Sequence, residues 1–114
     1  MLSIDDFVSS ANRNLSEVQK LFDEYQKKNF PERSPEFFCL ELNGEAGELA
    51  NAEKKRWKGK VVPHEIFQDE AADVLIALMN YVNSRNIDLG EAVRTKLLTI
   101  EKKRQELAEK GLNY

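Results

Sequence analysis

Apolar side chains recur along this chain at steps of three and four residues, the spacing that places them on one face of an α-helix. No segment alternates with a period of two, so no β-strand is predicted. Proline, glycine and helix-capping residues interrupt the pattern and divide the chain into four helical segments. The predicted helices run from a Ser3 cap to about Lys28, from Ser34 and Pro35 to just before Gly59, from Pro63 or His64 to about Asn86, and from an Asp88 cap to just before Gly111.

These elements predict an all-α fold, a four-helix-type bundle. The chain has 114 residues, the length of one domain, and no repeat or linker divides it, so residues 1–114 are predicted to form a single domain. Hydrophobic residues make up 41% and charged residues 32%, a balance typical of soluble helical proteins. No segment approaches the ~18 apolar residues of a membrane span, and the first ten residues carry acids where a secretory signal carries positive charge. We therefore expect a cytoplasmic protein without a membrane partner.

Cysteine and histidine offer little chemistry. With one cysteine, Cys39, and one histidine, His64, an internal disulfide and a Cys/His zinc site are excluded, and both residues are interpreted as structural or incidental. The net charge of -3 gives no overall attraction for nucleic acid, and the basic runs are interleaved with acids, so no nucleic-acid partner is expected. Any bound metal must be held by oxygen.

Carboxylates on the second predicted helix border its apolar face. Glu41, Glu45 and Glu48 are four and three residues apart and lie on one stripe. Gly44 and Gly47 lie next to these acids and have no side chains that would fill the space around them. Each glycine lowers the stability of a helix by about 1 kcal/mol relative to alanine. Close approach of another helix or of a ligand is the usual reason for such glycines.

A second acidic pair, Glu70 and Asp73, opens the apolar run of the third predicted helix, "DEAADVLIALMNYV". A buried carboxylate must be paired, protonated or bound to a cation. If the two helices pack antiparallel, this pair faces Glu45 and Glu48, and four carboxylates converge on a site that suits Mg²⁺, or Mn²⁺ as a substitute. The alternative is that the acids lie on the surface and pair with lysines of the second helix, Lys54, Lys55 or Lys58.

The segment "GEAGELANAEKK", followed by "DEAADVLIALMNYVNSRNIDLGEAVRTKL", resembles the MazG-like nucleoside triphosphate pyrophosphohydrolases of the all-α superfamily. The resemblance extends from about Phe37 to Arg104. The family signature is E-x-x-E followed by E-x-x-D, and the matching residues are Glu45, Glu48, Glu70 and Asp73.

This resemblance implies a fold, an activity and an assembly. Family members use Mg²⁺, held by those four acids, to hydrolyse nucleoside triphosphates between the α- and β-phosphates, which releases a monophosphate and pyrophosphate. They form dimers or dimers of dimers, so a homodimer or homotetramer is implied. Such activity clears particular nucleotides from the cellular pool. For the residue that orients or deprotonates the attacking water, Glu45 and Glu48 are both candidates.

Substrate contacts are predicted from residue type and position. A lysine or arginine can bind phosphate, an asparagine can hydrogen-bond a sugar or base, and a tryptophan can stack on a base. Each has a structural alternative: a solvated helix face for the basic residues, helix packing for the asparagine and the tryptophan. The candidates are Lys55, Trp57, Asn80, Lys96, Lys103 and Arg104.

Two other functions remain open at this point. The same fold can act on a biosynthetic nucleotide such as phosphoribosyl-ATP. The chain can also be a helical interaction module without enzymatic activity, in which case the acids only form ion pairs.

Overall fold

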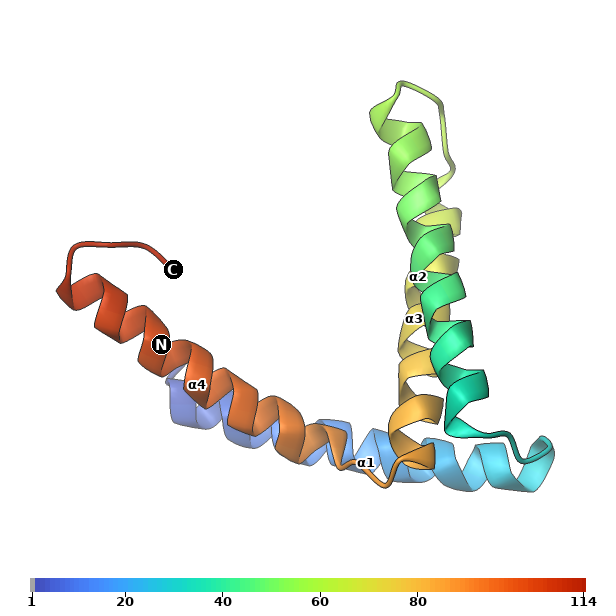
Figure 1. The fold of residues 1–114 in the computed structure, drawn as a ribbon, viewed down its shortest axis with the longest axis horizontal. Helices are drawn as coiled ribbons and strands as arrows, with labels where there is room; N and C mark the ends of the chain where they lie inside the picture. The colour runs from blue at the N-terminus through green and yellow to red at the C-terminus, as the bar shows by residue number, and fades with distance from the viewer. Residues whose placement is uncertain (1) are drawn as a thin grey trace. The chain divides into compact units, whose positions relative to one another are not determined.

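The computed structural model describes residues 2–114, which contain four α-helices and no β-strand. The helices are α1 (Ile4–Asn29), α2 (Pro35–Trp57), α3 (His64–Ser84) and α4 (Leu89–Glu109) (Figure 1). The predicted all-α class is therefore confirmed for the described residues. Within residues 2–114, no helix is both long enough and apolar enough to cross a membrane.

The helix boundaries follow from local chemistry. The Ser34 side chain accepts a hydrogen bond from the Phe37 N–H at 3.2 Å, and Pro35 occupies the first position of α2, where its missing N–H costs nothing. Gly59, with φ of 92°, follows the end of α2 in the left-handed conformation that glycine adopts without strain. α3 ends at Ser84, two residues before the predicted end, because Asn86 takes a left-handed φ of 55°.

The described chain divides into two compact units. The hairpin unit is Asp23–Asn86, and the terminal unit comprises the residues up to Phe22 together with Ile87–Tyr114. The last two turns of α1 belong to the hairpin unit and the rest of α1 to the terminal unit. The prediction of one domain over residues 1–114 stays a prediction.

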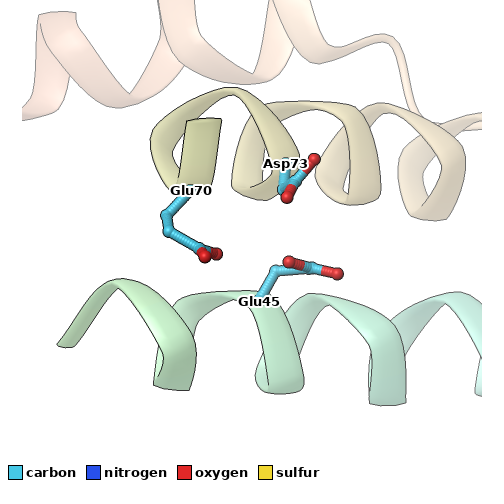
Figure 2. Close-up of side chains that lie close together, drawn as sticks. All are labelled: Glu45, Glu70 and Asp73. Carbon is cyan, nitrogen blue, oxygen red and sulfur yellow. The ribbon is translucent and has the colours of Figure 1, made fainter. Parts of the chain in front are cut away.

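In the hairpin unit, α2 and α3 pack side by side and antiparallel (Figure 1). Phe38 and Ala52 on α2 are buried, and Glu45 lies midway between them at seven-residue steps. On α3, Ala77 is buried seven residues after Glu70. Residues seven apart share one helix face, so these acids occupy positions that face the neighbouring helix (Figure 2).

In the terminal unit, polar groups connect α1 to the start of α4. The Gln19 side chain donates to the Ile87 carbonyl at 2.6 Å and accepts from the Leu89 N–H at 2.8 Å. A Cβ at Gly90 would overlap the Ser16 hydroxyl and the Asn12 carbonyl oxygen. The glycine in the first turn of α4, unfavourable for an isolated helix, is therefore explained by the close approach of α1.

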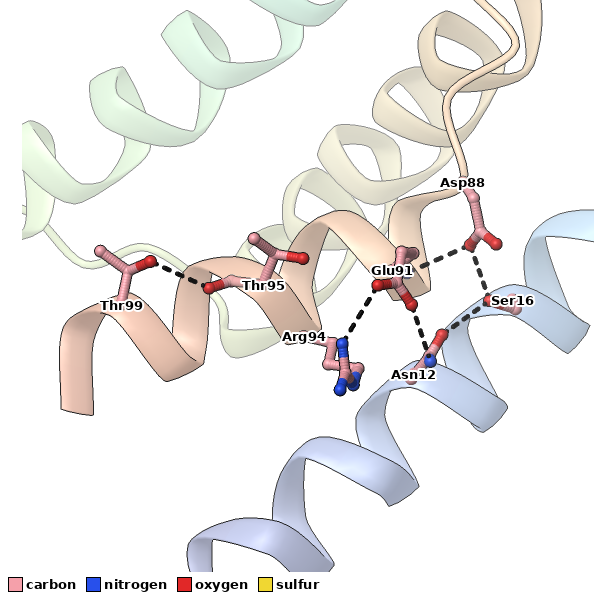
Figure 3. Close-up of polar contacts among 7 residues, drawn as sticks. All are labelled: Asn12, Ser16, Asp88, Glu91, Arg94, Thr95 and Thr99. Atoms are coloured by element: carbon pink, nitrogen blue, oxygen red, sulfur yellow. Dashed lines mark hydrogen bonds and ion pairs between the residues drawn. The ribbon is translucent and has the colours of Figure 1, made fainter. Parts of the chain in front are cut away.

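Asp88 caps α4 and also bonds to α1 (Figure 3). One carboxylate oxygen accepts from the Glu91 N–H at 3.2 Å and from the Ser16 hydroxyl at 2.7 Å. The Ser16 hydrogen bond, with that from the Glu91 backbone, lowers the pKa of Asp88 below its ordinary 3.8. Asn12 adds a hydrogen bond from its amide to the Glu91 carboxylate at 3.2 Å. The predicted Asp88 cap is confirmed.

Replacing Asp88 by alanine removes the cap and the bond to Ser16, and we expect a loss of about 1–2 kcal/mol in the free energy of unfolding at pH 7. Because folding lowers the pKa of Asp88, its ionised form stabilises the protein above its ordinary pKa, and this contribution is lost as pH falls through the lower folded value. Asp88→Asn is the matched control, since asparagine also caps helices but does not titrate. Urea unfolding of the three proteins at pH 7 and pH 3 measures both effects. An unchanged stability of Asp88→Ala at pH 7 would contradict this role.

Candidate metal centre

Three carboxylates converge between α2 and α3. Glu45 on α2 and Glu70 and Asp73 on α3 each place one oxygen within 4.8 Å of the others. Figure 2 shows the three side chains pointing toward one another across the space between the helices. Antiparallel packing sets the Glu70/Asp73 pair opposite Glu45, so the structure brings together three of the four acids in the predicted site. Their role as metal ligands stays a prediction.

The fourth acid, Glu48, lies beside this group rather than within it. Its side chain is exposed. The Glu48 carboxyl group nevertheless lies close enough to Glu45 and to Glu70 to form a hydrogen bond with either one when one of the two carboxyl groups is protonated. The charge of Glu48 also raises the pKa of both Glu45 and Glu70. All four acids therefore interact, with Glu48 on the solvent side.

The electrostatics of the cluster disfavour its charged form. The pKa of Glu45 is raised, first by loss of hydration and then by the charges of Glu48 and Asp73. The pKa of Glu70 is raised by loss of hydration and then by its interactions with Glu48. One oxygen of Glu45 and one of Glu70, the Oε2 atom in each, are buried with no hydrogen-bond partner within residues 2–114. The cluster thus contains buried acceptors that no described residue satisfies.

Lysines do not neutralise these acids. Among the described residues, the ion pairs involve other acids, namely Asp23, Glu53, Glu91 and Glu101. The predicted alternative, in which Lys54, Lys55 or Lys58 pairs with the cluster, is therefore not observed within residues 2–114.

The donor set fits a hard divalent cation. All the converging donors are carboxylate oxygens, which Mg²⁺ and Mn²⁺ prefer to nitrogen or sulfur. Ligands on opposite sides of Mg²⁺ are about 4 Å apart, and the oxygens here are at most 4.8 Å apart. A cation at the centre would satisfy the buried oxygens of Glu45 and Glu70 and cancel the mutual repulsion of the carboxylates.

The glycines next to the cluster border open space. A Cβ built on Gly44 or Gly47 would meet no atom within 4 Å. Within the hairpin unit, no neighbouring helix approaches these glycines closely.

The predicted substrate contacts are dispersed. Lys55 and Trp57 are exposed near the end of α2, and Lys55 is about 10 Å along the helix from Glu48. Asn80 is buried on α3, with 8% of its surface exposed, and borders a groove at the other end of the hairpin unit. The remaining candidates, Lys96, Lys103 and Arg104, belong to the terminal unit; Lys96 and Lys103 are exposed, and Arg104 pairs with Glu101.

The sequence analysis did not identify the other residues that line this groove. Phe30, which follows α1, and Asn83, one turn after Asn80, both border it. Two asparagines three residues apart in the mainly apolar second half of α3 are a detectable signal. The contribution of Phe30 depends on how the connection between α1 and α2 folds, which the periodic pattern does not predict.

Mg²⁺ should stabilise the wild-type protein, because a ligand that binds only the folded state raises the free energy of unfolding, by about 2.7 kcal/mol at one hundred times its Kd. In Glu45→Gln and Glu70→Gln we expect a higher melting temperature than wild type without metal, since charge repulsion is removed, and little further rise with Mg²⁺. Thermal unfolding with and without Mg²⁺ tests both expectations. The control is Glu53→Gln, an exposed acid of α2 outside the cluster, which should keep the wild-type response to Mg²⁺. A wild-type melting temperature that does not respond to Mg²⁺ or Mn²⁺ would exclude the metal centre.

Comparisons with models of protein families, with curated proteins and with solved structures found no match. The resemblance to MazG-like pyrophosphohydrolases therefore rests on the sequence motifs alone and stays a prediction. The functional argument depends on the geometry and charge of the carboxylate cluster.

Proposed function

We propose that this protein is a Mg²⁺-dependent pyrophosphohydrolase that cleaves (deoxy)nucleoside triphosphates between the α- and β-phosphates. The products are a nucleoside monophosphate and pyrophosphate, and the role is removal of particular nucleotides from the cellular pool. The observation that carries the proposal is the convergence of Glu45, Glu70 and Asp73 from two helices, with buried oxygens that have no partner within residues 2–114. The sequence motifs that resemble the MazG-like family contain these same residues.

A polyphosphate substrate explains why the site must also hold a cation. The substrate carries several negative charges, and a cluster made only of carboxylates would repel it. When bound, Mg²⁺ neutralises phosphate oxygens and lowers the pKa of a bound water.

The carboxylates divide into two roles in this proposal. Glu45, Glu70 and Asp73 hold the cation, because their oxygens are the ones that converge. Glu48 is exposed beside them and is the base that orients the attacking water and takes its proton. This position favours Glu48 over Glu45, the other candidate for that role.

Replacing Glu48 by glutamine should reduce turnover by at least about 10²-fold, the usual contribution of a general base. Asp73→Ala should abolish turnover because it removes a metal ligand. Both variants should keep the wild-type helix content in circular dichroism. Assays of pyrophosphate and of phosphate release, with Mg²⁺ and a panel of standard and modified nucleoside triphosphates, identify the bond that is cleaved.

The matched control for these variants is again Glu53→Gln, which should retain wild-type turnover. Phosphoribosyl-ATP belongs in the panel, since preferential turnover of that compound would place the enzyme in biosynthesis instead of nucleotide clearance. Wild-type turnover in Glu48→Gln and Asp73→Ala would contradict the assigned roles.

We also propose that the protein functions as a homodimer or homotetramer. Large apolar side chains on both helices of the hairpin unit are exposed in the single chain, with Leu40 at 74%, Leu75 at 46% and Ile76 at 43%. Buried apolar residues are few among the described positions, and none of the large side chains there is completely buried. We expect these side chains to form one apolar patch, and a patch of that kind usually marks an interface. A second copy would cover it and is consistent with the open space beside Gly44 and Gly47.

Sedimentation equilibrium should therefore give a mass of two or four chains at micromolar concentration. The double variant Leu75→Glu/Ile76→Glu places charge on the exposed face of α3 and should shift the protein toward a single chain. Val61→Glu is the control, because Val61 is 96% exposed and lies in the connection between α2 and α3, outside both helices. A wild-type protein of single-chain mass would contradict the proposed assembly.

A further inference from the structure

A groove of about 840 Å³ lies at one end of the hairpin unit. Its walls come from the last turns of α1, the connection that follows, the start of α2 and the end of α3. All of its lining residues belong to the hairpin unit. The volume is within the range of about 300–1,000 Å³ that is usual for small-molecule sites.

Asn80 is a polar residue in the wall of this groove. It borders the groove and more than nine-tenths of its surface is buried. Its side-chain amide carries both a hydrogen-bond donor and an acceptor for a ligand in the groove. Asn83 and Gln26 add two more side-chain amides to the same walls.

The charges that line the groove cancel. Two are acidic, Asp23 and Glu32, and two are basic, Lys27 and Arg33. The Lys27 ammonium lies 2.9 Å from the Asp23 carboxylate, and the Arg33 guanidinium lies 4.9 Å from the centre of the Phe37 ring. The groove therefore offers no excess charge to a phosphate and suits an uncharged group that forms hydrogen bonds.

Aromatic side chains complete the lining. Phe38 is buried at the start of α2, and the ring of Phe30 is half-exposed. Rings give a flat ligand a surface for stacking, while amides offer both a donor and an acceptor. The edges of nucleobases present donors and acceptors side by side. A nucleobase with its sugar is the ligand class that uses all of these features.

The position of the groove relative to the carboxylate cluster agrees with this ligand. Asn80 is seven residues after Asp73 on α3, and Phe38 is seven residues before Glu45 on α2. Seven residues correspond to about 10 Å along a helix, with both residues on one face. The groove and the cluster are thus neighbours on the same helix pair, separated by a distance that a nucleotide spans from its base to its phosphates.

We infer that this groove binds the nucleobase and sugar of the nucleotide and that Asn80 hydrogen-bonds the base. The inference rests on the proposed function, since the carboxylate cluster then holds the phosphates through a cation. Asn80 and the residues around it determine which base is accepted. The groove does not require the metal, so the nucleoside part should bind even without Mg²⁺.

The test is calorimetric titration with the four deoxynucleosides, deoxyadenosine, deoxyguanosine, deoxycytidine and thymidine, in the absence of Mg²⁺. We expect the wild-type protein to bind at least one of them, and Asn80→Asp, which keeps the shape of the side chain but removes its donors, to weaken that binding by at least about tenfold. Phe30→Ala is a second variant at a half-exposed position where folding is not at risk, and it should weaken binding as well. The control is Asn43→Asp, the same change at an exposed position of α2 outside the groove.

Failure of this inference differs from failure of the proposed function. Deoxynucleoside binding that depends on Asn80 and Phe30, in a protein that releases no pyrophosphate, would support the groove and overturn the enzymatic proposal. Pyrophosphate release whose KM for nucleoside triphosphate is the same in wild type, Asn80→Asp and Phe30→Ala would overturn the groove. A wild-type protein that binds none of the four deoxynucleosides would also overturn it.

Discussion

The mutual repulsion of carboxylates between two packed helices is the constraint on which the rest of this structure depends. The face of α2 that meets α3 carries Phe38 and Ala52, and Glu45 occupies the position midway between them. An apolar residue there would bind the helices more strongly, because burial and neighbouring charge both disfavour an ionised Glu45. The apolar contacts on either side must hold the helices together against this effect. Such local conflict with stability is typical of functional sites.

A seven-residue period organises the hairpin unit along both helices. On α2 it connects Phe38 with Glu45, and on α3 it connects Asp73 with Asn80. Positions seven apart lie on one helix face, so the carboxylate cluster and the amide-lined groove share the same faces of the same two helices. Charge is concentrated at the cluster and cancelled at the groove. This contrast supports separate binding of the charged and uncharged parts of one ligand.

The terminal unit depends on polar contacts and close approach more than on a large apolar core. Asp88 and Gln19 accept hydrogen bonds from Ser16 and from the Leu89 N–H where α4 begins. Gly90 has no side chain, which permits α1 to approach α4 closely. Few apolar side chains are buried among residues 2–114. Association of chains, as proposed above, is one source of the free energy that a closed core usually supplies.

The sequence by itself determined the helices, because apolar periodicity and capping residues act over a few neighbours. Ser34, Pro35, Gly59 and Asp88 predicted boundaries that the structure confirms, and the i,i+3 spacing of Glu70 and Asp73 predicted that both would point the same way. Only the tertiary structure decided that Glu45 meets that pair while Glu48 stays on the solvent side, since this depends on the rotation of α2 against α3. It alone decided that Phe30 and Asn83 border one groove, because residues more than fifty positions apart become neighbours only when the chain folds.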